Sequence, residues 1–113
     1  MGSEPAPDAP VVVLSTTPDP ETAAAIARDL VGRGLAACVN LLPGVRSIYR
    51  WEGAVEEAQE VLLVIKTRHG RLAELEVELL ALHPYDVPEF VALDPAHVEA
   101  RYLEWLRAGT TTP

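Results

Sequence analysis

Hydrophobic and polar positions at the start of the chain predict a strand followed by a helix. Residues 11–14 form a β-branched run that suits a central strand. Asp19 then supplies an N-cap, and Pro20 occupies the first helical position. Apolar residues follow at the spacing of one buried helical face: Ala23, Ile26, Ala27, Leu30 and Val31. Gly32 and Gly34 end this helix.

The next segment predicts one long hairpin. Residues 35–42 and 45–51 form a single strand, because a Pro43-Gly44 step is better explained by a bend or bulge than by a strand end. Alternation places Tyr49 and Trp51 on one face of this strand. Glu52-Gly53 is a tight-turn signal, so residues 54–67 return antiparallel. Their last part, residues 61–65, is uniformly apolar and should be covered on both faces.

The second half of the chain predicts a helix, an edge strand and a closing helix. The helix after Gly70 has Leu72, Leu75, Leu79 and Leu82 facing inward and Glu74 and Glu78 facing outward. It ends at His83, because the residue before a proline is disfavoured in a helix. Residues 88–93 form the edge strand. The closing helix is marked by Val98, Tyr102, Trp105 and Leu106.

This order of elements predicts an α+β fold of the ferredoxin-like type, β-α-β-β-α-β plus a C-terminal helix. Its antiparallel four-stranded sheet carries two helices on one face. The other face of the sheet and the long arm of residues 45–51 exceed what one small subunit covers. We therefore expect a symmetric oligomer.

Length and composition predict one domain in a chain of 113 residues. Residues 1–9 are rich in Pro, Ala and acid and form an expected disordered tail, residues 10–109 the domain, and residues 110–113 a loose C-terminus. Seventeen acidic against nine basic residues give a net charge of -8, which excludes nucleic acid or an anionic membrane as the main partner.

The sequence shows no membrane span, signal peptide or disulfide, and we therefore expect a cytoplasmic protein. No apolar run exceeds five residues, far below the roughly 20 of a membrane span. The first ten residues lack the basic and apolar regions of a signal peptide. Cys38 is the single cysteine, so no intrachain disulfide forms and a reducing cytoplasm fits best.

Candidate chemistry is sparse, which favours a protein that is not an enzyme. Phosphate-binding glycine motifs are absent. Cys38 lies in an apolar strand, where a thiol behaves as a small hydrophobe. His83 is followed by a turn stiffened by two prolines that carries Tyr85, Asp86 and Glu89. That turn has two interpretations, a plain helix stop or a binding site on a rigid loop.

Other polar and aromatic positions also leave alternatives open. Lys66 is either an exposed strand-end cation, a structural ion-pair partner, or, if it shares an end of the sheet with His83 or Glu89, a contact for an anion. Tyr49 and Trp51 are more often interface or core residues than a platform for a ligand.

Five segments together resemble a known family. They are VVVLSTTPD (11–19), LAACVNLLPGVRSIYRWEG (35–53), EVLLVIKT (60–67), HPYDVPE (83–89) and YLEWL (102–106). In this order, over residues 11–106, they resemble the CutA divalent-ion tolerance family.

The resemblance implies a cytoplasmic homotrimer linked to tolerance of copper and other divalent metals, with no established enzymatic activity. It also implies clefts between subunits, lined by Tyr49, Trp51, Lys66, His83, Tyr85 and Glu89.

One departure from the family bears on metal binding. Some members ligate copper through a Cys at the position of Ser15 and two adjacent histidines, at the positions of Leu82 and His83. Only His83 remains here, and one imidazole does not make a tight site. We expect no required cofactor and at most weak binding of a divalent metal such as copper, with His83 and Glu89 as ligands.

Two functions are therefore expected, from different classes. The first is a non-enzymatic cytoplasmic homotrimer acting in divalent metal tolerance, with itself and a metal ion as partners. The alternative is a trimeric sensor similar to PII signal proteins, in which Lys66 holds a small anionic ligand in an intersubunit cleft.

Overall fold

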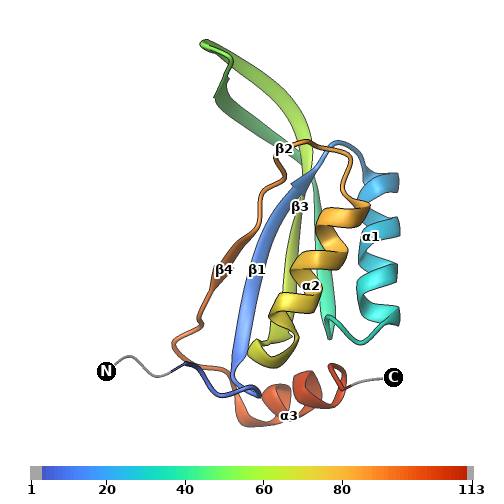
Figure 1. Cartoon of the computed structure of the whole chain (residues 1–113), viewed down its shortest axis with the longest axis vertical. Coiled ribbons are helices and arrows are strands. Elements are labelled where there is room, and N and C mark those ends of the chain that lie inside the picture. The colour runs from blue at the N-terminus through green and yellow to red at the C-terminus, as the bar shows by residue number, and fades with distance from the viewer. Residues whose placement is uncertain (1–3, 112–113) are drawn as a thin grey trace.

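The computed structural model describes residues 4–111 of the chain. Four strands and three helices follow in the order β1 (Pro10–Thr17), α1 (Pro20–Gly32), β2 (Cys38–Trp51), β3 (Ala54–Arg68), α2 (His69–Leu82), β4 (Val91–Leu93) and α3 (Ala100–Ala108) (Figure 1). Residues 1–3 of the expected tail and residues 112–113 of the expected loose end lie outside the described residues.

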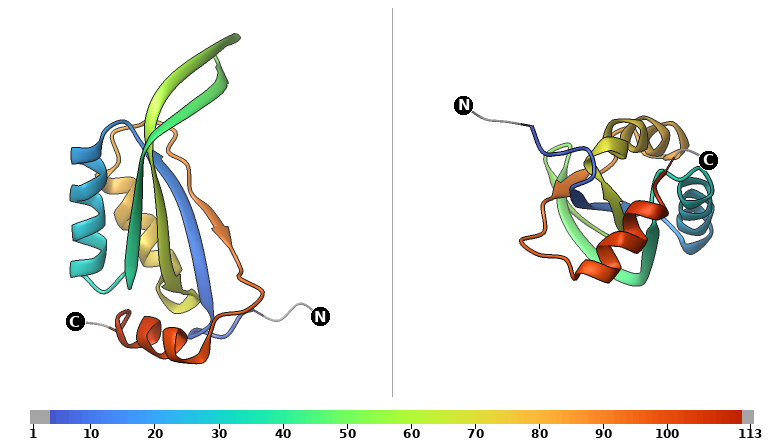
Figure 2. Two further views of the ribbon diagram at one scale, coloured as in Figure 1. Left: turned by 180° about the vertical axis from the view of Figure 1, so that it is seen from behind. Right: turned by 90° about the horizontal axis from the view of Figure 1, so that it is seen from below.

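The strands form one sheet in the order β2-β3-β1-β4, and every neighbouring pair is antiparallel. Helices α1 and α2 lie side by side on one face of the sheet, and α3 lies across one end of it (Figures 1 and 2). This arrangement confirms the ferredoxin-like α+β fold with an added C-terminal helix.

Helix α1 begins and ends as its sequence predicts. The carboxylate of Asp19 accepts a hydrogen bond of 2.7 Å from the backbone N–H of Thr22, which occupies an N–H left free by the first turn. The same bond holds the pKa of Asp19 below its usual value. After the helix, Gly34 adopts a positive φ of 70°, a conformation that favours glycine.

Strands β2 and β3 form the long hairpin. Their register shifts between Leu42 and Val45, which confirms a bulge at the Pro-Gly step within one continuous strand. Glu52 and Gly53 both have positive φ and make the tight turn at the tip. Strand β1 pairs with β3 only from Val61 onward, so residues 45–60 pair solely with each other and project as an arm (Figure 1).

The core lies between the sheet and the two helices. Alternate strand residues point into it, among them Val13, Leu63 and Ile65, and they pack against Ile26, Leu30, Leu75 and Leu79 of the helices. Removing these side chains from water is the main stabilising contribution to the subunit.

The opposite face of the sheet has no cover from any element within residues 4–111. Leu42, Val91 and Leu93 are exposed there, and Leu62 and Val64 are half-buried. The two-sided cover expected for residues 61–65 is therefore present on the helix face only. An apolar sheet face of this kind marks a surface for association.

Several element boundaries differ from the sequence expectation. Strand β2 begins at Cys38 rather than at residue 35, because the N–H groups of Leu35 and Ala36 both donate to the Leu30 carbonyl and still belong to the end of α1. Helix α2 begins at His69 and so includes Gly70. Strand β4 is limited to Val91–Leu93 rather than residues 88–93. Helix α3 begins at Ala100, so Val98 lies before the closing helix, whose N-cap is Glu99.

Two side chains of α2 also differ from the expected pattern. Leu82, expected inward, is 41 % exposed, because it lies in the last turn beyond the core layer. Glu78, expected outward, is half-buried, because its carboxylate lies 3.1 Å from the Arg33 guanidinium after α1.

Arg68, at the end of β3, joins both terminal segments. Its guanidinium donates to the Oγ1 and carbonyl oxygens of Thr110, at 3.1 and 2.9 Å, and to the carbonyl of Pro7 at 3.3 Å. Thr110 is fully buried, and the Pro7 carbonyl also accepts the Gly70 N–H. Among the described residues, Thr110 and the segment around Pro7 are thus bonded to the end of β3.

Removing the Arg68 side chain should loosen both segments. We expect Arg68→Ala to lower the free energy of unfolding by about 1–3 kcal/mol, because buried oxygens of Thr110 lose their donors. Amide hydrogen exchange should rise at Ala9 and Thr110. Arg28→Ala, at an exposed position of α1, is the control and should change neither quantity. Unchanged exchange in Arg68→Ala would contradict this role.

Candidate functional site

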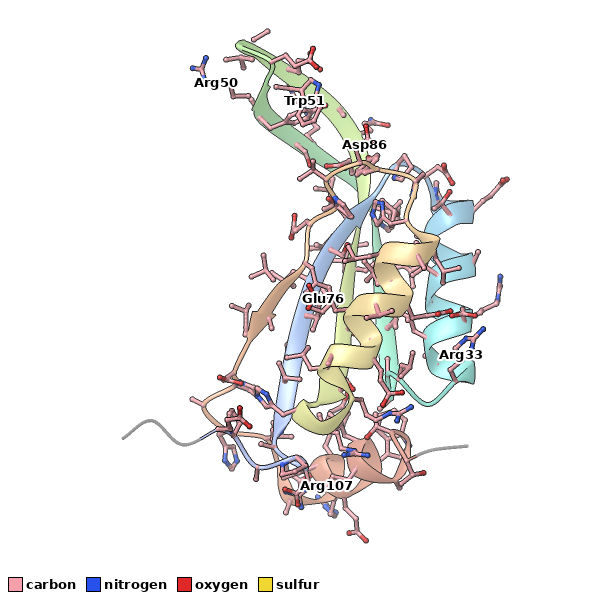
Figure 3. The ribbon with its side chains drawn as sticks, viewed as in Figure 1. Arg33, Arg50, Trp51, Glu76, Asp86 and Arg107 are labelled. Carbon is pink, nitrogen blue, oxygen red and sulfur yellow. The ribbon has the colours of Figure 1, made fainter. Side chains whose placement is uncertain are left out.

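A groove of about 640 Å³ lies between the arm and the loop that follows α2. Its walls come from the end of β1, from one face of the arm and from the loop: Thr16, Ser47, Tyr49, Trp51, Glu56, Glu60, Pro84, Tyr85, Asp86, Val87 and Glu89. Figure 3 shows Trp51 on the arm and Asp86 on the loop beneath it. This volume is typical of sites for small molecules.

Strand alternation explains the arm's contribution. Tyr49 and Trp51 share a face of β2, and they pair with Glu56 and Ala54 of β3. Residues directly opposite each other in an antiparallel pair point to the same side, so aromatic rings and a carboxylate line one wall together.

Glu60 and Tyr85 line the groove and are bonded to each other. The Tyr85 hydroxyl donates to Glu60 Oε2 at 2.8 Å, and Glu60 is only 9 % exposed. Burial, and then the neighbouring carboxylate, raise the pKa of Tyr85 far above its usual value, so the phenol stays protonated. Tyr85 is therefore a fixed donor that orients the Glu60 carboxylate.

His83 holds the loop in place through both ring nitrogens. Its Nδ1 accepts the Tyr85 N–H at 3.1 Å, so the proton of the neutral ring is on Nε2, which donates to the Thr16 carbonyl at 2.8 Å. The His83 and Tyr85 rings also lie against each other in a tilted arrangement, with centroids 4.8 Å apart and planes inclined by 50°. In this arrangement His83 has no free nitrogen for a metal ion.

Replacing His83 with alanine should destabilise the subunit and loosen the groove. We expect the free energy of unfolding to fall by about 1–3 kcal/mol, because the part-buried Thr16 carbonyl and Tyr85 N–H lose their partners. Urea unfolding measures this change. His97→Ala removes an exposed imidazole and should have little effect; equal losses in the two variants would contradict the assigned role.

The groove is acidic. Glu56, Glu60, Asp86 and Glu89 contribute carboxylates, and no Lys, Arg or His belongs to the described lining. Sequence analysis placed Tyr49, Trp51, Tyr85 and Glu89 in a cleft, and the structure brings these four together. Glu56 and Glu60 also line the groove, and the sequence did not indicate either of them as a site residue.

Lys66 lies away from this cluster within the subunit. It pairs with Val12 of β1, whereas Thr16, at the groove, pairs with Leu62, about 13 Å along the strand. Its ammonium donates to the Asn40 side chain. The position of Lys66 in a shared cleft stays a prediction that needs a second subunit.

The residues do not fit a preformed metal centre. No group of three His, Cys, Asp or Glu side chains within residues 4–111 is arranged to hold a metal ion. Ser15 is fully buried on the helix face of β1 with no hydrogen-bond partner for its hydroxyl in the described chain, and Leu82 is exposed. Cys38 is half-exposed at the start of β2, at the opposite end of the sheet from His83.

None of the helices within the described residues has the length and apolarity that a membrane span requires.

Comparisons with known proteins agree on one family. The family model described as CutA1 divalent ion tolerance protein matches residues 11–109. A divalent-cation tolerance protein CutA from Thermus thermophilus is 52 % identical over 99 residues, covering 88 % of this chain and 96 % of the relative. The solved structure of the divalent cation tolerance protein Cut A1 from Thermus thermophilus superposes with a TM-score of 0.87 at 51 % identity, over 90 % of this chain and 99 % of that one.

A plant relative shows the same match within a longer protein. Protein CutA, chloroplastic, from Arabidopsis thaliana is 45 % identical over 100 residues, which is 88 % of this chain and 55 % of the relative. The family model and these identities reach over most of the chain described above. The chain therefore belongs to the CutA1 divalent ion tolerance protein family.

Proposed function

We propose that this chain forms a non-enzymatic homotrimer that acts in the tolerance of divalent metal ions such as copper, in the cytoplasm. The observation that carries the proposal is an uncovered apolar sheet face together with an acidic groove, which lies where β1 ends and the arm begins. The description of the family supports a role in divalent metal tolerance. The exposed apolar sheet face supports assembly into a homotrimer.

Assembly of three copies would cover what one subunit leaves open. Leu42, Val91 and Leu93 are exposed on the sheet, and Ile48 and Val55 are exposed on the arm. A homo-oligomer with closed symmetry buries such surfaces without leaving further open sites. Native mass spectrometry and light scattering test this point: the proposal expects three times the 12.2 kDa of one chain.

Metal binding is proposed to be weak. The exposed Glu89 is the more accessible of the two expected ligands, because His83 must first release the Thr16 carbonyl or the Tyr85 N–H. Calorimetric titration with Cu²⁺ should therefore give weak binding that His83→Ala and Glu89→Gln reduce further. Glu76→Gln, on the exposed side of α2, is the control. Identical isotherms for all four proteins would remove His83 and Glu89 from the proposed metal site.

Catalysis is not part of the proposal. A nucleophile requires a base within hydrogen-bonding distance. Cys38 pairs with Lys66 in the sheet, far from His83, whose two nitrogens are engaged. Slow labelling of Cys38 by a thiol reagent in the folded protein is the expected result, and rapid labelling would favour an enzyme.

The alternative, a trimeric sensor with an anionic ligand, depends on Lys66. This lysine is half-buried on the uncovered sheet face, so it would have to meet the groove of a neighbouring subunit. A thermal-shift screen of nucleotides and small carboxylates tests the alternative. A stabilising ligand that loses its effect in Lys66→Ala would favour it over metal tolerance.

A further inference from the structure

We propose that a turn near the N-terminus, residues 6–9, is a detachable cap for helix α2 that also ties α3 to this helix. The N-terminal turn would open and close as one unit while the core stays folded. This conformational device goes beyond the proposed function, because it depends neither on metal binding nor on assembly. Residues 6–9 also precede residue 11, where the match to the CutA1 family model begins.

The N-terminal turn is largely preformed by its own sequence. The Ala9 N–H donates to the Ala6 carbonyl at 2.9 Å, which closes a β-turn with Pro7 and Asp8 at its two central positions. Proline favours the first central position, because its ring fixes the φ angle that the turn requires. The turn therefore loses little conformational freedom when it docks on the rest of the chain.

Helix α2 has no side-chain cap at its start. Arg68 occupies the N-cap position, and its side chain makes no capping hydrogen bond. Instead, the His69 N–H donates to the Ala9 carbonyl at 2.9 Å, and the Gly70 N–H donates to the Pro7 carbonyl at 2.7 Å. The first N–H groups of a helix have no acceptor within the helix. The N-terminal turn therefore supplies the acceptors that a capping side chain supplies elsewhere.

Gly70 makes room for the turn against α2. A Cβ atom at this position would lie 2.9 Å from the Pro7 carbonyl oxygen and 3.3 Å from the Pro7 Cβ, and it would also meet the flexible end of Arg68. The end of Arg68 can rotate away, whereas the backbone oxygen moves only if the turn moves. Glycine within a helix otherwise lowers stability relative to alanine, so contact with the turn accounts for its place here.

The same turn is bonded to α3. The Arg107 guanidinium donates to the Asp8 carbonyl at 3.1 Å and lies 3.5 Å from the Asp8 carboxylate. Figure 1 shows the N-terminal segment, in blue, beside α3. The carbonyls of three successive residues, Pro7, Asp8 and Ala9, thus accept hydrogen bonds from two different helices.

Hydrogen bonds hold the turn, with little burial of its side chains. Residues 4–8 are exposed, and Ala9 is half-buried. Segments with few buried apolar contacts open locally far more often than the core does. Opening would free the first N–H groups of α2 and the Arg107 guanidinium together, so both helices would loosen as one unit. Cleavage within this exposed segment would have the same effect.

Amide hydrogen exchange of the full chain under native conditions tests the proposal. Pro7→Gly keeps every carbonyl but gives the open turn more conformational freedom, so exchange at His69 and Gly70 should rise together by about twofold to fivefold. Pro5→Gly, just outside the turn, is the matched control and should leave both rates unchanged. Core amides of β1 and β3 should keep their rates in both variants. Equal rates in Pro7→Gly and Pro5→Gly would overturn the proposal.

Gly70→Ala tests the contact by the sign of its effect. The added Cβ displaces the Pro7 carbonyl, so exchange at His69 should rise about fivefold. At a helix end without the turn, the same substitution would favour the helix and slow this exchange. Gly32→Ala is the control, because a Cβ there meets nothing within 4 Å, and it should not affect His69. Slower exchange at His69 in Gly70→Ala would contradict the cap.

Arg107→Ala tests the link between the two helices. Removing the donor to the Asp8 carbonyl should raise exchange at His69 about threefold, although Arg107 lies on α3 and His69 on α2. Arg101→Ala is the control on the same helix, since its side chain is 93 % exposed and pairs with Glu99. Unchanged exchange at His69 in Arg107→Ala would overturn the link to α3.

Discussion

Leu93→Glu is expected to convert the proposed trimer into folded monomers. Leu93 points from β4 to the uncovered face of the sheet and is 48 % exposed in the subunit. A glutamate there is tolerated by a single chain in water. In a trimer the same carboxylate would be buried without a partner, at a cost of several kcal/mol, about 3–5 by analogy with broken buried pairs.

Light scattering and native mass spectrometry distinguish the two states directly. Val77→Glu is the matched control, because Val77 is 71 % exposed on the outer side of α2 and the substitution adds the same charge. The control should keep the mass of the wild-type assembly. A Leu93→Glu protein that also keeps that mass would show that this face is not the interface.

Leu75→Ala is expected to produce a large loss of stability in the core. Leu75 is fully buried where α2 packs on the sheet, beside Leu79 and Ile65. Truncating a buried leucine removes apolar contacts and leaves a cavity, which costs about 2–5 kcal/mol. Urea unfolding should show this loss as a lower midpoint with a similar slope.

Leu80→Ala, five residues further along the same helix, is the control for this prediction. Leu80 is 43 % exposed, so its truncation should cost about 0.5 kcal/mol or less. Both variants need the same subunit concentration, because assembly contributes to apparent stability. Similar losses in the two variants would contradict the assigned core.

Local signals in the sequence were sufficient to predict most of the fold. The Asp19 cap, the Glu52-Gly53 turn and the β-branched run of β1 act over a few residues, and the structure has each where it was expected. The bulge at Pro43-Gly44 was also predicted, because proline and glycine have positional meaning in strands.

The boundaries and the ends of the chain required tertiary contacts. Composition alone indicated a loose segment from Thr110, whereas a guanidinium 42 residues earlier in the chain donates two hydrogen bonds to this buried threonine. Leu82 fits an apolar helical pattern, yet the core layer ends one turn before it. Neither the distance between residues along the chain nor the periodicity of apolar positions reveals the bonds of Thr110 or the exposure of Leu82.

The groove was only partly predictable. Tyr85 and Glu89 belong to a motif that is local in sequence, whereas Glu60 joins them through a contact between residues 25 apart. Glu60 did carry a signal, because it directly precedes the buried run that begins at Val61. Lys66 was expected at the cleft but lies away from the groove within the subunit. Its position near the end of a strand did not reveal at which end of the sheet it lies.

The projecting arm also bears on how the chain avoids unwanted self-association before assembly. Long exposed strands invite edge-to-edge pairing, and charged side chains are a common defence against it. The arm carries Arg46 in a 2.7 Å ion pair with Glu57, and the charged Arg50 close to its tip. Burying these charges would be costly, so they disfavour non-specific pairing of one hairpin with another.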